Sequence, residues 1–154
     1  MSRAFVNEDN LGHFDDLPDR PVSSHPNDVT ASGLAQIDAA LAAAKTAYAA
    51  AQVSQDRSAL ALAARDLRYW TARRSTARLV PPQPGSKTVR FGATVSIVRT
   101  DGRKQTFRIV GEDEADPNKG SISHVSPLAK SMIGKAVGDS VRAGNTEAEI
   151  VAIA

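Results

Sequence analysis

The sequence predicts an α+β protein, in which an antiparallel α-helical hairpin, a coiled coil, precedes a small β-rich domain with one short helix. Three observations carry this prediction. Apolar residues recur at three- and four-residue spacings within residues 30–79, prolines interrupt residues 80–88, and strand-like runs fill residues 89–154. Residues 1–29 are rich in Pro, Asp and Asn, and we expect them to form a disordered or loosely docked leader.

Composition excludes several classes of protein. The 154 residues include 23% charged and 42% hydrophobic residues and no cysteine, so disulfides and thiolate chemistry are absent. No apolar run approaches the roughly 18 residues that a membrane-spanning helix needs. The polar start MSRAFVNEDNLGHFDD is not typical of a secretory signal. We therefore expect a cytoplasmic protein that has no membrane partner.

Charge is distributed unevenly along the chain. Residues 1–30 carry six acidic residues against two arginines, whereas residues 31–79 carry seven basic residues against three acidic ones, a net charge of +4. A local positive field of this kind suits a polyanionic surface, although a solvated helix face gives the same count.

The two arms of the hairpin follow from their apolar spacing. Thr30 or Ser32 can cap the first helix, and Ser54 is the better candidate cap for the second. The stretch AAQVSQDRSAL, residues 50–60, lies between two helical patterns and becomes the tip when the arms fold back on each other. The first apolar stripe consists of Leu34, Ile37, Leu41, Ala44, Tyr48 and Ala51, and the second of Leu60, Ala63, Leu67, Trp70, Arg74 and Ala77, broken at Arg74.

The C-terminal half has the pattern of a β-rich unit. VPPQPGSK cannot continue a helix and is expected to be a linker. ATVSIVRT and KQTFRIV flank DGR, which is typical of a hairpin. In SPLAKSMIG, Ser126 is the expected cap of a short helix and Pro127 its first residue. DSVRA and EAEIVAIA supply two further strands.

Specific motifs accompany this pattern. FGATVSIV, RIVGEDEADPNKGSIS, SPLAKSMIGKAVGDSV and AEIVAI, within residues 89–153, closely resemble the C-terminal domain of the bacterial Gre transcript-cleavage factors, the GreA/GreB family. MSRAFV and RDLRYW resemble the GreB-type branch more weakly. The resemblance implies an FKBP-like domain that docks on the rim of the secondary channel of RNA polymerase, and a hairpin that projects into that channel. It assigns polymerase binding to Asp113, Asp116, Pro117, Ser126 and Pro127.

The tip departs from the pattern of the family it resembles. Members that stimulate cleavage of backtracked RNA carry an Asp and a Glu spaced D-x-x-E, because two carboxylates can hold the second Mg²⁺ of a two-metal reaction. Here Asp56 is followed three residues later by Ala59, and Arg57 adds a positive charge beside it. We therefore predict no catalytic residue, no metal site and no cofactor, with Mg²⁺ and Asp56 involved only if the protein does stimulate cleavage. Asp56 is more simply an acid at a helix start.

Arginines gather on the second helix. By resemblance they face the channel wall and the nascent RNA, contacts that would depend strongly on salt. A solvated helix face is an equally simple interpretation. The set consists of Arg57, Arg65, Arg68, Arg73 and Arg74.

Three other chemical interpretations are weaker. EDEADP lacks the spacing of a calcium loop, so a docking loop is preferred to a metal site. Trp70 lies in the apolar stripe of its helix and is expected to pack there. Prolyl isomerase activity needs an aromatic-lined pocket, yet residues 80–154 contain only Phe91 and Phe107, and fold similarity alone does not carry function.

The sequence thus predicts a monomeric regulator of transcription elongation that binds RNA polymerase and is not itself an enzyme. Two alternatives stay open. One is a genuine cleavage stimulator in which Asp56 acts with a Mg²⁺ held by the polymerase. The other is an interaction protein whose hairpin pairs with another copy or an unrelated partner.

Overall fold

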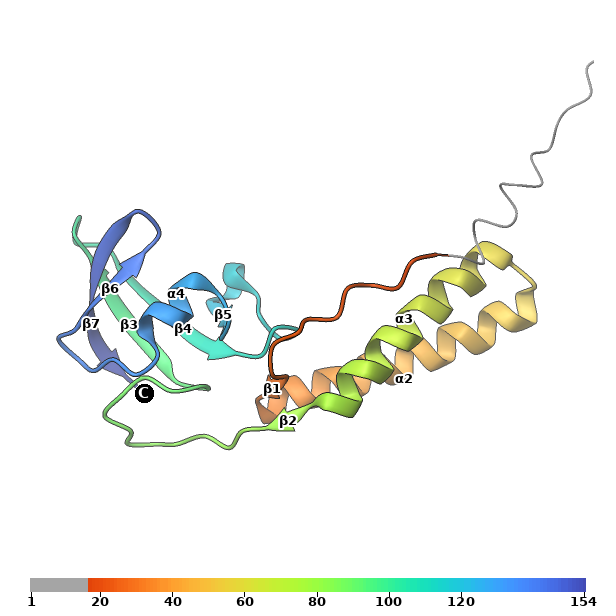
Figure 1. Cartoon of the computed structure of the whole chain (residues 1–154), viewed down its shortest axis with the longest axis horizontal. Coiled ribbons are helices and arrows are strands. Elements are labelled where there is room, and N and C mark those ends of the chain that lie inside the picture. Colours follow the sequence, from red (N-terminus) through yellow and green to blue (C-terminus); the bar gives the residue numbers. More distant parts are fainter. Residues whose placement is uncertain (1–16) are drawn as a thin grey trace, which may run out of the picture. The chain divides into compact units, whose positions relative to one another are not determined.

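The structure is a computed structural model that describes residues 17–154. It confirms the α+β class, with two long helices followed by a mixed sheet (Figure 1). The chain divides into two compact units. The helical unit comprises Ile37–Thr76 with the segment that ends at Ser24, and the β unit comprises His25–Gln36 and Ala77–Ala154.

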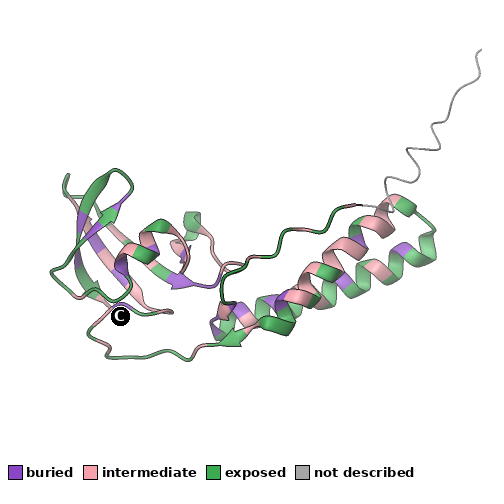
Figure 2. Cartoon of the chain, in the orientation of Figure 1, coloured by how far each residue is buried: buried purple, intermediate pink, exposed green. Residues whose placement is uncertain are grey.

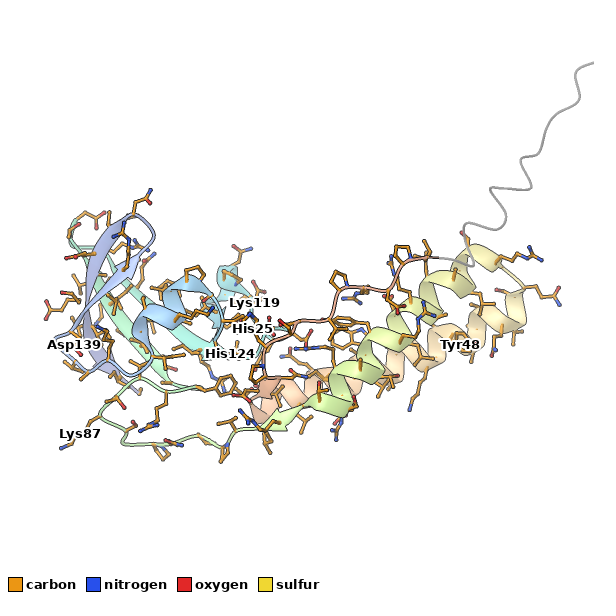
Figure 3. All side chains as sticks on the ribbon, in the orientation of Figure 1. His25, Tyr48, Lys87, Lys119, His124 and Asp139 are labelled. Atoms are coloured by element: carbon orange, nitrogen blue, oxygen red, sulfur yellow. The ribbon has the colours of Figure 1, made fainter. Side chains whose placement is uncertain are left out.

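Helix α2, Ala31–Ser54, and helix α3, Arg57–Thr76, form the hairpin. The predicted stripe of α2 is confirmed, because all six of its positions are buried or half-buried, whereas most other residues of the helix are exposed (Figure 2). Ile37, Ala44 and Ala51 are buried, and Tyr48, labelled in Figure 3, is half-buried near the tip. Alanine favours the helix intrinsically but buries little area, so the interior of the hairpin is thin.

The stripe of α3 differs from the prediction at one position. Arg74 is exposed, and its Nε lies 2.6 Å from Oδ1 of Asp38 on α2. The neighbouring Arg73 is the buried one, at 2% exposure. Spacing alone placed the break in the apolar stripe one residue too late, because a helix turns about 100° per residue and both positions border the stripe.

The β unit contains a five-stranded sheet. Strands β3, Thr94–Arg99, and β4, Lys104–Val110, form the predicted hairpin, and β6, Ser140–Ala143, pairs with β7, Thr146–Ile153. The order is β5-β4-β3-β7-β6, and only β4 and β5 are parallel. The core is formed by Val89, Val95, Ile97, Ile109, Ile122, Ala129, Met132, Val141, Ala143, Ala148 and Ile150.

Helix α4, Pro127–Met132, begins as predicted. The Ser126 side chain caps it by accepting from the Ala129 N–H at 3.3 Å, and Pro127 occupies the first turn. The helix buries Ala129 and Met132 in the core of the sheet domain. The sequence did not predict strand β5, Ser121–Ser123, or the 3₁₀ turn η1, Pro117–Lys119, since three residues are too few for a periodic pattern.

The structure also pairs β1, Asp28–Val29, with β2, Arg78–Leu79, in a two-residue parallel ladder. The Asp28 carboxylate accepts a hydrogen bond from the Arg78 guanidinium at 2.7 Å, which raises the pKa of Arg78. Part of the segment expected to be a leader is therefore built into the β unit. Residues 1–16 lie outside the described residues, and none of the described helices is long and apolar enough to cross a membrane.

Candidate functional site

The tip of the hairpin is a turn of two residues. Helix α2 ends at Ser54, Gln55 adopts a left-handed backbone with φ of 56°, and α3 begins after Asp56. The left-handed conformation reverses the chain without glycine, at a steric cost of about 1 kcal/mol. The tip thus lies where the sequence predicted it, although Ser54 is not the cap of the second helix.

Asp56 is that cap. Its Oδ1 accepts a hydrogen bond from the Ala59 N–H at 3.1 Å, and its carbonyl accepts from the Leu60 N–H at 2.9 Å. Such a cap satisfies one of the N–H groups that the first turn leaves unpaired. One carboxylate oxygen of this exposed residue is therefore committed to α3, and the exposed Arg57 follows it in the sequence.

This geometry is poor for holding a metal ion. Mg²⁺ demands near-octahedral oxygen coordination, and two carboxylates on one tip would be the minimal protein contribution. Ala59, at the position where a second carboxylate would stand, contributes only its backbone N–H to the cap. Within residues 17–154, no three histidine, aspartate or glutamate side chains gather in a way that could hold a metal ion.

The arginines of α3 are largely engaged within the helical unit. Arg68 Nε lies 2.6 Å from Asp19 Oδ1, and Arg74 is paired with Asp38. Arg73 is buried, which corrects its prediction as a residue facing the channel or RNA. Arg57 is exposed next to the tip, and Nε of half-buried Arg65 has no hydrogen-bond partner among the described residues.

Of the residues predicted to bind polymerase, most have a structural role as well. Asp116 caps η1 by accepting from the Asn118 N–H at 3.2 Å, and Pro117 is the first residue of that turn. Ser126 and Pro127 start α4 in the same way. Asp113 is half-buried in the loop between β4 and η1. Polymerase contact by these residues stays a prediction.

Sequence reasoning missed the role of Glu114, a carboxylate that accepts hydrogen bonds from two hydroxyl groups. Its side chain is 8% exposed, and it accepts hydrogen bonds from the Thr30 hydroxyl and, at 2.6 Å, from the Ser32 hydroxyl. Thr30 also caps α2, because its Oγ1 accepts from the Gly33 N–H at 3.0 Å. The negative charge thus lies at the positive end of α2, where it is favourable.

A shallow polar hollow of about 330 Å³ adjoins this carboxylate. Glu114, Arg108 and Ser121 line part of it, and Lys119 projects from η1 into solvent at its edge (Figure 3). Since 82 and 84 residues separate Glu114 from its two hydroxyl partners, no local pattern could have signalled this cluster.

Comparison with known proteins identifies the β unit. Residues 83–154 match the family model described as "Transcription elongation factor, GreA/GreB, C-term". Residues 83–154 are thus similar to the C-terminal domain of the GreA/GreB family. Among curated relatives, it is 51% identical over 69 residues to transcription elongation factor GreA of Hyphomonas neptunium, covering 44% of this chain and 40% of that protein.

The match to a GreB protein is longer. The chain is 42% identical over 95 residues to transcription elongation factor GreB of Neisseria meningitidis serogroup B, which covers 58% of either chain. The chain therefore spans about two fifths to three fifths of the length of these curated relatives. A solved structure, GreA factor homolog 1 of Thermus thermophilus, is similar with a TM-score of 0.42 and 20% identity, covering 84% of this chain and 99% of that one.

Proposed function

We propose that this protein is a regulator of transcription elongation that binds RNA polymerase without strongly stimulating transcript cleavage. The family of residues 83–154 supports RNA polymerase as the partner, since the matching model is that of elongation factors. In this proposal the C-terminal domain docks on the rim of the secondary channel, and the hairpin enters the channel towards nascent RNA. The protein acts as a cytoplasmic monomer and is not itself an enzyme.

One observation carries the second half of the proposal: the tip presents a single carboxylate, and that carboxylate caps its own helix. Stimulation of phosphodiester cleavage through a second Mg²⁺ requires that the tip hold the ion and position the attacking water. A lone carboxylate with one oxygen committed, beside the guanidinium of Arg57, supplies too few ligands. Occupation of the channel would then change elongation or pausing, or the access of other channel factors.

The loop and helix start that carry Asp113, Asp116, Pro117, Ser126 and Pro127 are the proposed polymerase contacts. Asp113 is the residue chosen for the test, since Asp116 and Ser126 cap local turns. We expect Asp113→Arg to weaken binding to purified polymerase at least tenfold, about 1.4 kcal/mol. Asp101→Arg, on the turn between β3 and β4, is the charge-matched control that should leave binding unchanged.

The decisive experiment measures RNA cleavage in purified, backtracked elongation complexes. The protein is added alone and is then titrated against an authentic cleavage factor. We expect no cleavage by the protein alone, and progressive loss of the authentic factor's activity as the two compete for the channel. Cleavage by the protein alone would instead support the alternative in which Asp56 holds Mg²⁺.

Two variants separate the chemistry of the tip from its folding. Asn accepts the same hydrogen bond as Asp at a helix cap, so Asp56→Asn keeps the cap and removes the charge. Any cleavage that Asp56→Asn abolishes therefore depends on the carboxylate. Ala59→Glu creates the D-x-x-E pair, and we expect it to raise cleavage above that of the parent chain. No gain would mean either that the tip does not reach the active site of the polymerase or that the positive charge of Arg57 prevents Mg²⁺ from binding.

The interaction-protein alternative makes a different prediction. A hairpin that pairs with a second copy would give a concentration-dependent dimer in sedimentation, and that dimer would not bind polymerase. A monomer that binds polymerase excludes this alternative.

A further inference from the structure

An extended segment, residues 17–24, runs along α3 within the helical unit (Figure 1). We call this segment the strap. Its Asp19 carboxylate pairs with Arg68 at 2.6 Å, and its Arg20 guanidinium donates to Asp66 Oδ1 at 3.1 Å. The strap has no regular secondary structure, and these two ion pairs are among the contacts that join it to α3.

The Arg20 guanidinium contacts three side chains of α3. Asp66, Tyr69 and Trp70 are spaced i, i+3 and i+4 on α3, so they share one side of the helix. The Arg20 guanidinium carbon lies 3.9 Å from the centre of the Tyr69 ring and 5.6 Å from that of Trp70. The two rings meet edge to face at 4.9 Å. Cation–π attraction and the ion pair therefore act on the same guanidinium.

The two ion pairs of the strap are partly exposed to solvent. The Arg68 and Asp19 side chains are 52% and 70% exposed, and those of Arg20 and Asp66 are 36% and 44% exposed. Exposed ion pairs contribute little, because water and salt screen them and ordering long side chains is unfavourable. A ligand that offers comparable contacts to α3 can displace the strap.

The surface beneath the strap has the chemistry of a site for single-stranded nucleic acid. Such sites combine aromatic rings, on which bases stack, with cations that contact phosphates. Removal of the strap would expose the rings of Tyr69 and Trp70 and release Arg68 from Asp19. Arg65, one helical turn before Tyr69, contributes a guanidinium whose Nε has no hydrogen-bond partner among the described residues.

Charge along the chain agrees with this arrangement. Residues 57–76 carry five arginines and one aspartate, a net charge of +4. The charge of α3 therefore favours an anionic ligand, whereas the strap, with Asp19 and Arg20, has no net charge.

We propose that the strap competes intramolecularly with single-stranded nucleic acid for the side of α3 formed by Arg65, Arg68, Tyr69 and Trp70. The parent chain then binds such a ligand weakly, and release of the strap strengthens binding. The competition takes place within the isolated chain and needs no polymerase. Its failure would therefore leave the proposed polymerase function untouched.

The test measures fluorescence anisotropy of a short, labelled single-stranded RNA titrated with the full chain. The double variant Asp19→Asn/Arg20→Gln removes both ion pairs of the strap without changing the net charge. We expect its affinity for the RNA to exceed that of the parent by about tenfold, about 1.4 kcal/mol. Further replacement of Arg68 by Gln in this background should remove the gain.

A matched control exists in the β unit. Asp101 and Arg103 form another exposed pair at 2.6 Å, so Asp101→Asn/Arg103→Gln makes the same chemical change away from α3. This control should bind RNA like the parent. Equal tightening in both double variants, or none in the strap variant, would overturn the proposal.

Trp70 is the only tryptophan of the chain and reports the strap directly. Quenching of its fluorescence by acrylamide should increase in the strap variant and not in the control, while circular dichroism shows that both are folded. Unchanged quenching would mean that the strap does not cover Trp70, which contradicts the proposal. Increased quenching without tighter RNA binding would contradict the competition.

Discussion

The helical unit and the β unit are stabilised by different means. The β unit buries branched side chains such as Ile97, Ile109 and Ile150 completely. The hairpin buries mainly alanines, together with one charged residue, Arg73. Because apolar burial contributes in proportion to area, it stabilises the β unit more than the hairpin. The proposed function, in which the β unit docks and the hairpin presents side chains to a partner, would use both properties.

Truncation of the β core should have the largest effect. Ile97 is 0% exposed at the centre of the sheet, and Ile97→Ala should reduce the free energy of unfolding by about 2–5 kcal/mol through lost burial and a residual cavity. Val137→Ala is the control, since Val137 is 58% exposed and should cost less than about 0.5 kcal/mol. Hydrogen exchange of the strand amides measures both. Similar losses would mean that burial does not set the stability of this unit.

Substitution of two adjacent arginines, Arg73 and Arg74, tests how burial contributes to the stability of the hairpin. Arg73 is fully buried, so Arg73→Ala should destabilise the helical unit by about 2–4 kcal/mol through the cavity and the loss of buried polar contacts. Arg74→Ala breaks an exposed pair with Asp38 and should cost about 0.2–1 kcal/mol. Denaturant unfolding followed by Trp70 fluorescence reports this unit alone. A larger loss of stability in Arg74→Ala than in Arg73→Ala would mean that Arg74 is the buried arginine, as the sequence predicted.

A glycine-to-alanine substitution near the start of α2 should change stability in the direction opposite to the usual one. Gly to Ala inside a helix normally stabilises by about 1 kcal/mol. A Cβ on Gly33 would lie 2.7 Å from Oε1 of Glu114, whose side chain the Thr30 and Ser32 hydroxyls hold in place. Gly33→Ala should therefore destabilise the parent chain but stabilise a Glu114→Ala chain. A double-mutant cycle by thermal unfolding gives the coupling, and equal effects in both backgrounds would rule out the contact.

The smallest effect concerns the turn between β3 and β4. The pKa of the Asp101 carboxyl lies below its usual value, chiefly because the Arg103 N–H donates to it at 3.0 Å; burial opposes this shift, and the Arg103 guanidinium adds to it. A lowered folded-state pKa gives stability that is present above the unfolded-state pKa and is lost as pH falls through the folded-state value. An NMR titration of Asp101 should show the low midpoint. Arg103→Gln should retain most of the shift, and its complete loss would assign the effect to the guanidinium.

The sequence by itself determined the elements that a short pattern specifies. The stripe of α2 from Leu34 to Ala51, the β3–β4 hairpin around DGR, and the Ser126 cap of α4 all depend on residues within a few positions of each other. Local spacing and capping chemistry are sufficient there, because the interacting groups are brought together by the helix or strand itself. The lone carboxylate at the tip was likewise evident from Asp56 and Ala59.

Only the tertiary structure decided which charged side chains are buried or paired within the chain. It buried Arg73 rather than Arg74, placed Asp19 and Arg20 on α3, and held Glu114 against Thr30 and Ser32. These partners lie far apart in the sequence, and no periodicity connects a loop to a helix start. Whether a charge binds a partner or stabilises its own chain depends on which opposite charge folding brings within a few ångströms of it, and that is a property of the packed chain.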